Sequence, residues 1–166
     1  EESVGYLSLW LFYAKPPGRG VYGWHPLDPE YSLIHERVSW LMPELVARGH
    51  AIGVHSSFNS WRDANALLKE RNAVAERSNT WPRHVRQHWL RFGTATTWKA
   101  QRAAGFLTDY TLGFNDRPGF RASTALPLAP KAGGMIAIPT MLMDSNLFGA
   151  QFPSRNSREA MIDHLL

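Results

Sequence analysis

The sequence predicts an α/β fold in which most strands of one sheet run parallel. Short apolar runs alternate with helical segments along the chain, and this alternation is typical of parallel strands joined by right-handed helical crossovers, in an open sheet or a barrel. The chain has 166 residues, of which 44% are hydrophobic, so it can bury a core of ordinary domain size. No internal repeat, low-complexity tract or linker interrupts it, and we expect residues 1–166 to form a single domain.

The first half of the chain is expected to contain two strands, each followed by a helix. Both strands are apolar runs that are too short for a helix, and turn or capping residues mark where the helices begin and end. We place the strands at residues 5–13 and 51–55 and the helices at residues 39–48 and 61–77. Pro43 would then lie in the first helical turn, where proline is tolerated, and Ser60 begins a capping box ahead of the second helix.

The second half continues the alternation with three more strands. We place them at residues 85–89, 106–112 and 135–143. A helix capped by Thr94 or Thr96 is expected to run to Ala104, and a last helix is expected from about residue 156 onward. Gly105 is expected to end the first of these helices. A glycine-rich loop at residues 113–123 follows the strand at 106–112.

Polar side chains gather where four successive strands end. They are His55, then Arg86 and His88 two residues apart, then Asp116, Arg117 and Arg121 in the glycine-rich loop, and finally Asp144. Ligands of parallel α/β sheets bind at the carboxyl ends of the strands, so we expect these groups to converge on one cleft. Each also has a purely structural alternative: hydrogen bonding within its loop, pairing with a neighbouring charge, or capping of a turn or helix.

Composition excludes several classes of protein. The chain has no cysteine, which excludes a disulfide scaffold and a cysteine-ligated zinc site. No apolar run approaches the roughly 18 residues that span a bilayer, so we expect no membrane span. The net charge of +4 comes mainly from dispersed arginines, which suit either a solvated surface or anion binding. No recognised nucleic-acid motif is present, and we expect no nucleic-acid partner.

Both ends of the chain are unusual for a complete protein. It begins at Glu1 without a methionine and ends at Leu166 within a predicted helix that has no stop signal. We therefore expect this chain to be a piece of a longer protein.

Four segments, taken in order, resemble the motifs of polysaccharide deacetylases of the NodB-homology superfamily, and more narrowly an uncharacterised bacterial branch of it. They are residues 49–57, 86–92, 112–122 and 138–144. The resemblance spans roughly residues 5–147 and implies a distorted (β/α) barrel, here incomplete at both ends. It also implies metal-assisted removal of acetyl groups from a carbohydrate substrate, with a divalent metal, usually zinc, activating water. Residence in the bacterial cytoplasm is a further expectation from it.

The resemblance assigns roles to individual residues. His55 matches the first metal-binding histidine, and Arg86 matches the arginine that orients the catalytic carboxylate. We assign a catalytic role to Asp144 as well. We assign substrate binding to four residues of the second and third motifs: Trp89, Asp116, Arg117 and Arg121.

This sequence also departs from the family pattern. Asn59 stands where a second metal histidine is expected, and an amide oxygen is a poor substitute for imidazole at zinc. His88 is our candidate for the missing nitrogen. The family's paired aspartates belong to a strand before Gly5, and Glu1 and Glu2 do not match them. We thus expect zinc in the full-length protein but weak zinc binding, or none, in this chain, with little deacetylase activity.

A second interpretation is a non-catalytic carbohydrate-binding domain that has lost the metal site. It is favoured by Asn59, by the seven tryptophans of the chain, and by Tyr22 and Trp24 in the loop that follows the first strand, because sugars stack on aromatic faces. A third interpretation, nucleic-acid binding, has only the arginine content in its favour.

Overall fold

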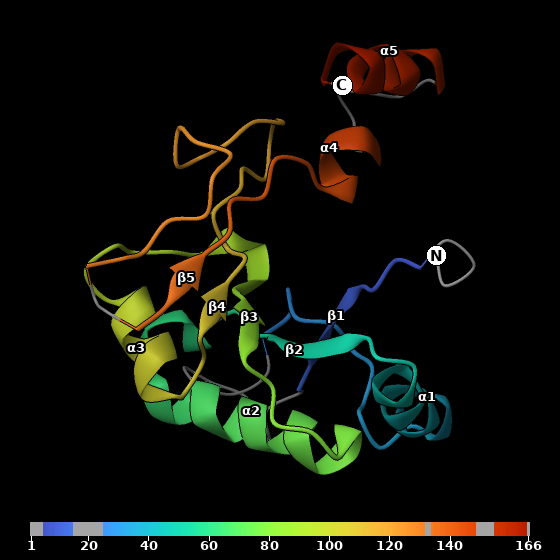
Figure 1. Cartoon of the computed structure of the whole chain (residues 1–166), viewed down its shortest axis with the longest axis vertical. Helices are drawn as coiled ribbons and strands as arrows, with labels where there is room; N and C mark the ends of the chain where they lie inside the picture. The colour runs from blue at the N-terminus through green and yellow to red at the C-terminus, as the bar shows by residue number, and fades with distance from the viewer. Residues whose placement is uncertain (1–4, 15–24, 132–133, 149–154, 166) are drawn as a thin grey trace.

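The structure, a computed structural model, describes residues 5–14, 25–131, 134–148 and 155–165. Its centre is a sheet of five strands in the order β1-β2-β3-β4-β5 (Figure 1). The strands are β1 (Leu9–Tyr13), β2 (Ala51–His55), β3 (His84–Arg86), β4 (Thr108–Asp109) and β5 (Ile136–Ala137). All four neighbouring pairs are parallel, which confirms the predicted mainly parallel α/β fold.

The strand order explains why the helices gather on one side. Because each strand pairs with the next strand along the chain, every right-handed crossover moves in the same direction and leaves its helix on the same face. This is the arrangement of a barrel wall, although the five strands among the described residues do not close a barrel. Three helices cover the sheet (Figure 1): α1 (Glu36–Ala47), α2 (Ala64–Ser78) and α3 (Thr97–Ala103). Two further helices follow β5, α4 (Asp144–Phe148) and α5 (Arg155–Leu165).

The hydrophobic core lies between the helices and the sheet. Met42 of α1, Leu67 and Val74 of α2, Val54 of β2 and Val85 of β3 are each fully buried. Burial of such side chains contributes roughly 1.5–3 kcal/mol each, and this layer fixes how the strand ends are placed. Of the helices in the described part of the chain, none has the length and apolar character needed to cross a membrane.

Four of the strands are shorter than the sequence predicts. β1 begins at Leu9 rather than at residue 5. The ladder of β3 stops at Arg86, and the predicted strand to residue 89 becomes a 3-10 turn, η3 (His88–Leu90), in which Trp89 has a φ of 54°. The predicted strands at 106–112 and 135–143 reduce to the two-residue β4 and β5. Proline cannot donate to a ladder, so Pro139 helps to explain why β5 ends early.

Two helix starts also differ from prediction. α1 begins at Glu36, three residues before the predicted start, because the His35 carbonyl already accepts hydrogen bonds from the backbone N–H groups of Val38 and Ser39. Pro43 therefore lies inside α1 rather than in its first turn, which removes one helical hydrogen bond.

The predicted second helix is divided in two. A 3-10 turn, η2 (Ser60–Arg62), precedes α2, and the N-cap is Asp63 rather than Ser60. The Asp63 carboxylate accepts a hydrogen bond of 2.9 Å from the backbone N–H of Ala66. The predicted end of α3 is confirmed, since Gly105 follows the helix with a φ of +84°.

Candidate active-site cleft

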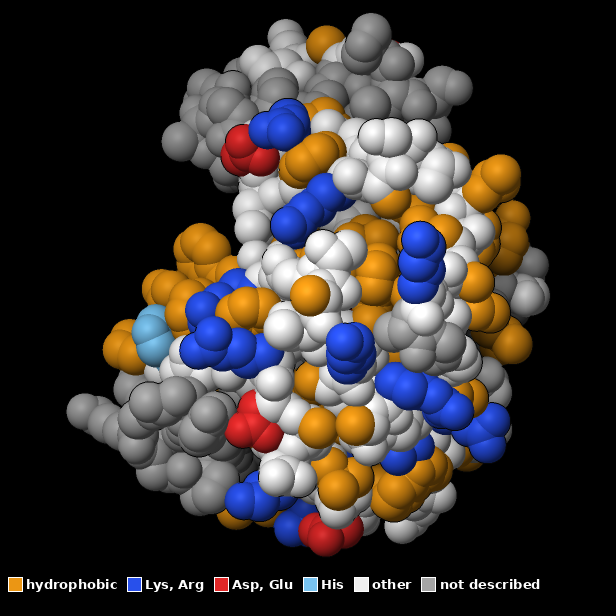
Figure 2. All heavy atoms as spheres, turned by 90° about the vertical axis from the view of Figure 1, so that its left-hand side faces the viewer, with side chains coloured by type: hydrophobic (Ala, Val, Ile, Leu, Met, Phe, Trp, Pro, Cys, Tyr) orange, Lys and Arg blue, Asp and Glu red, His pale blue; other side chains and the backbone are white. Residues whose placement is uncertain are grey.

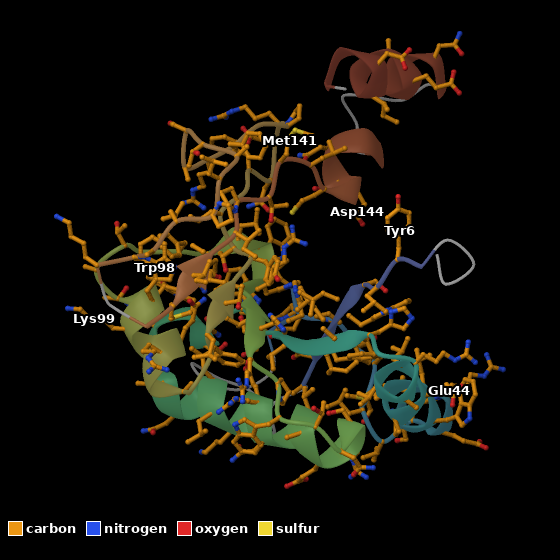
Figure 3. All side chains as sticks on the ribbon, in the orientation of Figure 1. Tyr6, Glu44, Trp98, Lys99, Met141 and Asp144 are labelled. Atoms are coloured by element: carbon orange, nitrogen blue, oxygen red, sulfur yellow. The ribbon has the colours of Figure 1, made fainter. Side chains whose placement is uncertain are left out.

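A cleft of about 560 Å³ opens at the carboxyl ends of β2 and β3. Five of the residues singled out in the sequence line it: His55, Arg86, His88, Trp89 and Asp144. The remaining lining residues are Gln87, Leu90, Asn115, Met143 and Ser145. Figure 3 shows Asp144 at the start of α4, beyond the end of the sheet. The lining thus combines the ends of two strands, the η3 turn and the start of α4.

Two histidines contact each other directly in this cleft. His55 is the last residue of β2 and pairs in register with Arg86 of β3. Its Nε2 lies 2.6 Å from Nδ1 of His88, with the two rings nearly perpendicular. His88 Nε2 also contacts the carbonyl oxygen of Leu27. A carbonyl only accepts, so His88 donates to Leu27 through Nε2.

Burial keeps His55 uncharged. Desolvation, together with the charges of His88 and Arg86, lowers the pKa of His55 from 6.5 to about 3. The imidazole is therefore neutral at physiological pH. This is the form that can bind a metal or accept a proton, although its Nε2 already contacts Nδ1 of His88.

Arg86 brings a positive charge without a fixed partner. Its Nη2 atom is buried and has no hydrogen-bond partner among the described residues. Burial lowers the pKa of Arg86, and the negative charges of Asp144 and Asp109 oppose that shift. The structural alternative for Arg86, pairing with a carboxylate, is thus not seen in the part of the chain described. Its guanidinium is available to a carbonyl or anionic group of a ligand.

Asn115 is a cleft residue that the sequence analysis missed. Its side-chain amide donates to the carbonyl oxygen of Trp89 at 2.8 Å. The backbone carbonyl oxygen of Asn115 accepts a hydrogen bond from the Asn146 side chain at 3.3 Å and another from the Ser145 hydroxyl at 3.5 Å. Asn115 therefore joins the η3 turn to the start of α4, where Asp144 lies. Its position just before Asp116 in the third motif was the only signal that could have identified it.

Several predicted site residues lie elsewhere. Asp116 and Arg117 form an exposed ion pair of 3.0 Å, and Arg121 donates to the carbonyl oxygen of Leu90 at 3.0 Å. Asn59 accepts a hydrogen bond of 3.3 Å from Arg91. These four predicted residues are absent from the cleft lining, and their substrate-binding or metal-binding roles stay predictions.

Two buried carboxyl groups hold the loop that follows His55. Glu70 of α2 accepts hydrogen bonds from the Ser57 backbone, the Ser57 hydroxyl and the Ser60 hydroxyl, and Asp28 accepts from the backbone N–H of Phe58 at 2.7 Å. Burial dominates at Glu70 and raises its pKa from 4.5 to about 8. The sequence does contain a signal for Glu70, because it stands three residues after Leu67 and four before Val74, on the apolar face of its helix.

The described residues do not make up a metal site. They contain no group of three His, Cys, Asp or Glu side chains placed to hold a metal ion. The two cleft nitrogens face each other at 2.6 Å, whereas two ligands of a tetrahedral zinc ion, each about 2.0–2.1 Å from the metal, lie roughly 3.3 Å apart. Zinc binding would require the histidines to separate and further ligands to join them.

A known protein is similar to this chain in fold. No family model matches the sequence, and no curated protein matches it. One similar fold is the crystal structure of a Mycobacterium smegmatis protein that is provisionally described as a polysaccharide deacetylase. The two chains are 23% identical, with a TM-score of 0.47. The match covers 65% of this chain and 37% of the other, so this chain corresponds to well under two thirds of that protein's length.

Proposed function

We propose that the cleft binds an acetylated carbohydrate and belongs to a site that hydrolyses its acetyl group. The observation that carries the proposal is the convergence of His55, Arg86, His88 and Asp144, from separate segments, on one cleft. The order of four motifs that resemble those of polysaccharide deacetylases supports it independently.

Five of the lining residues have a role in this proposal. The half-exposed indole of Trp89 gives a flat apolar surface on which a sugar ring can stack. The unpartnered guanidinium of Arg86 donates to the acetyl carbonyl or orients Asp144. The exposed Asp144 carboxylate takes a proton from the attacking water as general base. His55 and His88 contact each other and form the floor of the cleft beside Arg86.

A non-catalytic carbohydrate-binding domain is the second candidate function. The observation in its favour is the hydrogen bond between Asn59 and Arg91, which holds this amide away from the cleft lining. In this case the cleft would keep its sugar contacts and lack hydrolytic activity.

Titration of the chain with N-acetylated chitotetraose and O-acetylated xylotetraose, followed by NMR, tests binding. We expect one of them to shift the indole resonance of Trp89 and the backbone resonances of Asp144 and Ser145. Acetate release is then measured with the product of the complete gene. Asp144→Asn should lower release about 100-fold and leave binding within about twofold. Glu44→Gln, a change on α1 at a side chain that lines no part of the cleft, is the matched control.

The outcomes separate the two candidates. Acetate release that depends on Asp144 supports the hydrolase. Binding at Trp89 with no release from the complete gene product supports the binding domain. Failure of both oligosaccharides to perturb the cleft at 10 mM (roughly a 2.7 kcal/mol limit on affinity) would contradict both.

A further inference from the structure

Two neighbouring hollows lie at the opposite end of the sheet from the cleft. The larger, about 530 Å³, is lined by α2 and the turn after it: Asn72, Ala75, Glu76, Asn79, Thr80 and Trp81. The smaller, about 230 Å³, includes Ala51 and Ile52 at the start of β2 and His84 at the start of β3. Thr80 and Trp81 line both hollows, so the Trp81 indole stands between them. A ligand in these hollows could not contact the cleft at the carboxyl ends of the same strands.

The indole of Trp81 is exposed yet held in place. It is 53% exposed. The guanidinium of Arg71 lies over its ring, 4.4 Å from the ring centroid. Arg71 itself is buried and is anchored by hydrogen bonds to the carbonyl oxygens of Pro82, at 2.6 Å, and Ala104, at 3.1 Å. Such a cation–π contact restricts the ring, which lowers the entropy lost when a ligand stacks against it.

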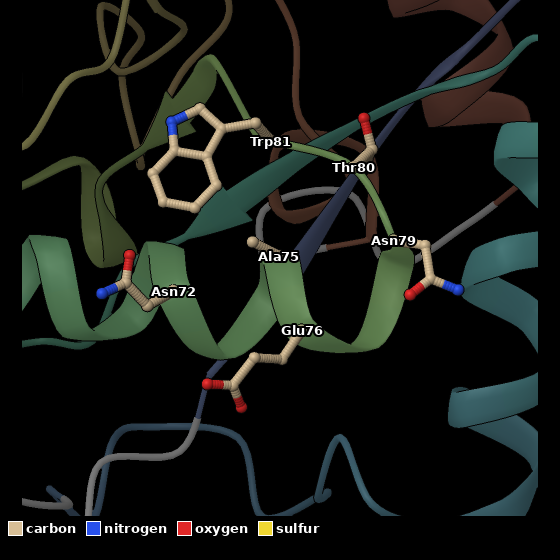
Figure 4. A pocket seen from close by; sticks show the side chains of 6 residues that line it. All are labelled: Asn72, Ala75, Glu76, Asn79, Thr80 and Trp81. Carbon is tan, nitrogen blue, oxygen red and sulfur yellow. The ribbon is translucent and has the colours of Figure 1, made fainter.

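The turn after α2 determines where the Trp81 indole lies. Asn79 ends the helix in the left-handed conformation, with a φ of 52°, as asparagine commonly does at this position. The chain then reverses, and Figure 4 shows Trp81 lying back along α2 beside Asn72 and Ala75.

Polar side chains line the larger hollow beside the ring. The side chains of Asn72, Glu76 and Asn79 are exposed, and the structure gives them no hydrogen-bond or ion-pair partner among the residues it describes. Amides offer both donors and acceptors, and the carboxylate of Glu76 adds further acceptors. A flat aromatic face bordered by such groups matches the alternation of C–H faces and hydroxyl groups on a sugar ring. The carboxylate of Glu76 in the larger hollow and the guanidinium of Arg83 in the smaller one give the site no single sign of charge, which suits a neutral ligand.

We propose that Trp81 is the platform of a second carbohydrate-binding site, distinct from the cleft, for a neutral oligosaccharide. Since hollows lie on two sides of the indole, the ligand is longer than one sugar unit. One unit stacks on Trp81, the units along the larger hollow hydrogen bond to Asn72 and Asn79, and the other end extends toward His84. The site does not require the cleft to be a deacetylase. It would hold a long glycan at a distance from the cleft.

NMR titration of the chain with cellotetraose, xylotetraose and chitotetraose tests this proposal. We expect at least one tetrasaccharide to shift the Trp81 indole resonance and the side-chain amide resonances of Asn72 and Asn79. Trp81→Ala should weaken this binding at least about tenfold, as truncation of a central aromatic contact does. Trp81→Phe should restore part of the affinity, and Asn72→Ala should weaken it several-fold. Trp40→Ala removes another exposed tryptophan, one that lines neither hollow. This variant should leave the affinity for the tetrasaccharide unchanged.

Two results would overturn the proposal. The first is that none of the three tetrasaccharides shifts the Trp81 indole at 10 mM. The second is that binding keeps its full affinity in Trp81→Ala while the protein stays folded by its amide spectrum, which would place the ligand elsewhere. Trp89→Ala distinguishes this proposal from the proposed function. In this variant, oligosaccharides should no longer shift the resonances of the cleft residues but should still shift the indole resonance of Trp81.

Discussion

The pH dependence of stability should reveal the buried carboxyl group of Glu70. This side chain is buried against Ser57 and Ser60, and its pKa rises from 4.5 to about 8 in the folded protein. Between these two values the unfolded chain has lost the proton that the folded protein keeps. The free energy of unfolding therefore falls as pH rises, by about 1.4 kcal/mol per pH unit for one linked proton.

The neutral variant Glu70→Gln should remove this dependence. Relative to the wild type, its stability should rise by about 3 kcal/mol between pH 5.5 and 7.5, which is two pH units at that slope. Between pH 3 and 6.5, His55 makes the free energy of unfolding rise with pH, because its pKa is lowered from 6.5 to about 3 in the folded protein. That contribution is common to both proteins, so it cancels in the difference between them.

Urea denaturation followed by tryptophan fluorescence at pH 5.5, 6.5 and 7.5 provides the measurement. Glu76→Gln changes an exposed carboxyl on the same helix. The difference in free energy of unfolding between this variant and the wild type should stay constant over the three pH values. A difference between Glu70→Gln and the wild type that stays constant within about 0.5 kcal/mol over this range, which is well below the roughly 3 kcal/mol expected for one linked proton, would refute the reasoning.

Three further predictions concern the metal, a helix cap and the sheet. Zinc titrated calorimetrically into the chain should show no one-to-one site tighter than micromolar, because the described residues supply two facing imidazole nitrogens and lack a third ligand beside them; a tight site that disappears in His55→Ala would contradict this. Asp63→Ala should destabilise the protein by about 1 kcal/mol, since it removes the N-cap of α2, and thermal denaturation checks it against Asp63→Asn, which keeps a capping oxygen. Gly53→Ala should cost about 3 kcal/mol, because its Cβ would lie 2.6 Å from Leu11 Cδ2 and 2.8 Å from the His84 carbonyl oxygen; an unchanged urea midpoint would show that β1 and β3 can move apart.

Charge illustrates what composition alone can predict. The sequence indicated dispersed arginines rather than a basic block. On the face shown in Figure 2, lysine and arginine side chains are spread in small groups among apolar and polar ones. Two arginines contact groups within the protein: Arg71 and Arg91 each donate to a backbone carbonyl oxygen and stack on an aromatic ring.

The sequence by itself determined the α/β class, the strand at Ala51–His55 and the order of strands and helices as far as β5, but not the helix α4. These features follow from apolar periodicity and from turn residues such as Gly49 and Gly105, which are local in the chain. The expectation that polar groups at strand ends meet was also correct for His55, Arg86, His88 and Asp144, because parallel pairing brings the strands' carboxyl ends to one edge.

Only the tertiary structure decided where strands stop and which polar groups meet. A ladder extends only as far as its neighbours allow, so β4 and β5 have two residues each, whatever the length of their apolar runs. Glu70 meets Ser57 and Arg71 meets Trp81 across the packing of α2 against the strands and loops around it. Asp116 pairs with its own neighbour rather than the cleft. Side-chain partners depend on distances between segments far apart in sequence, and local patterns do not encode these distances.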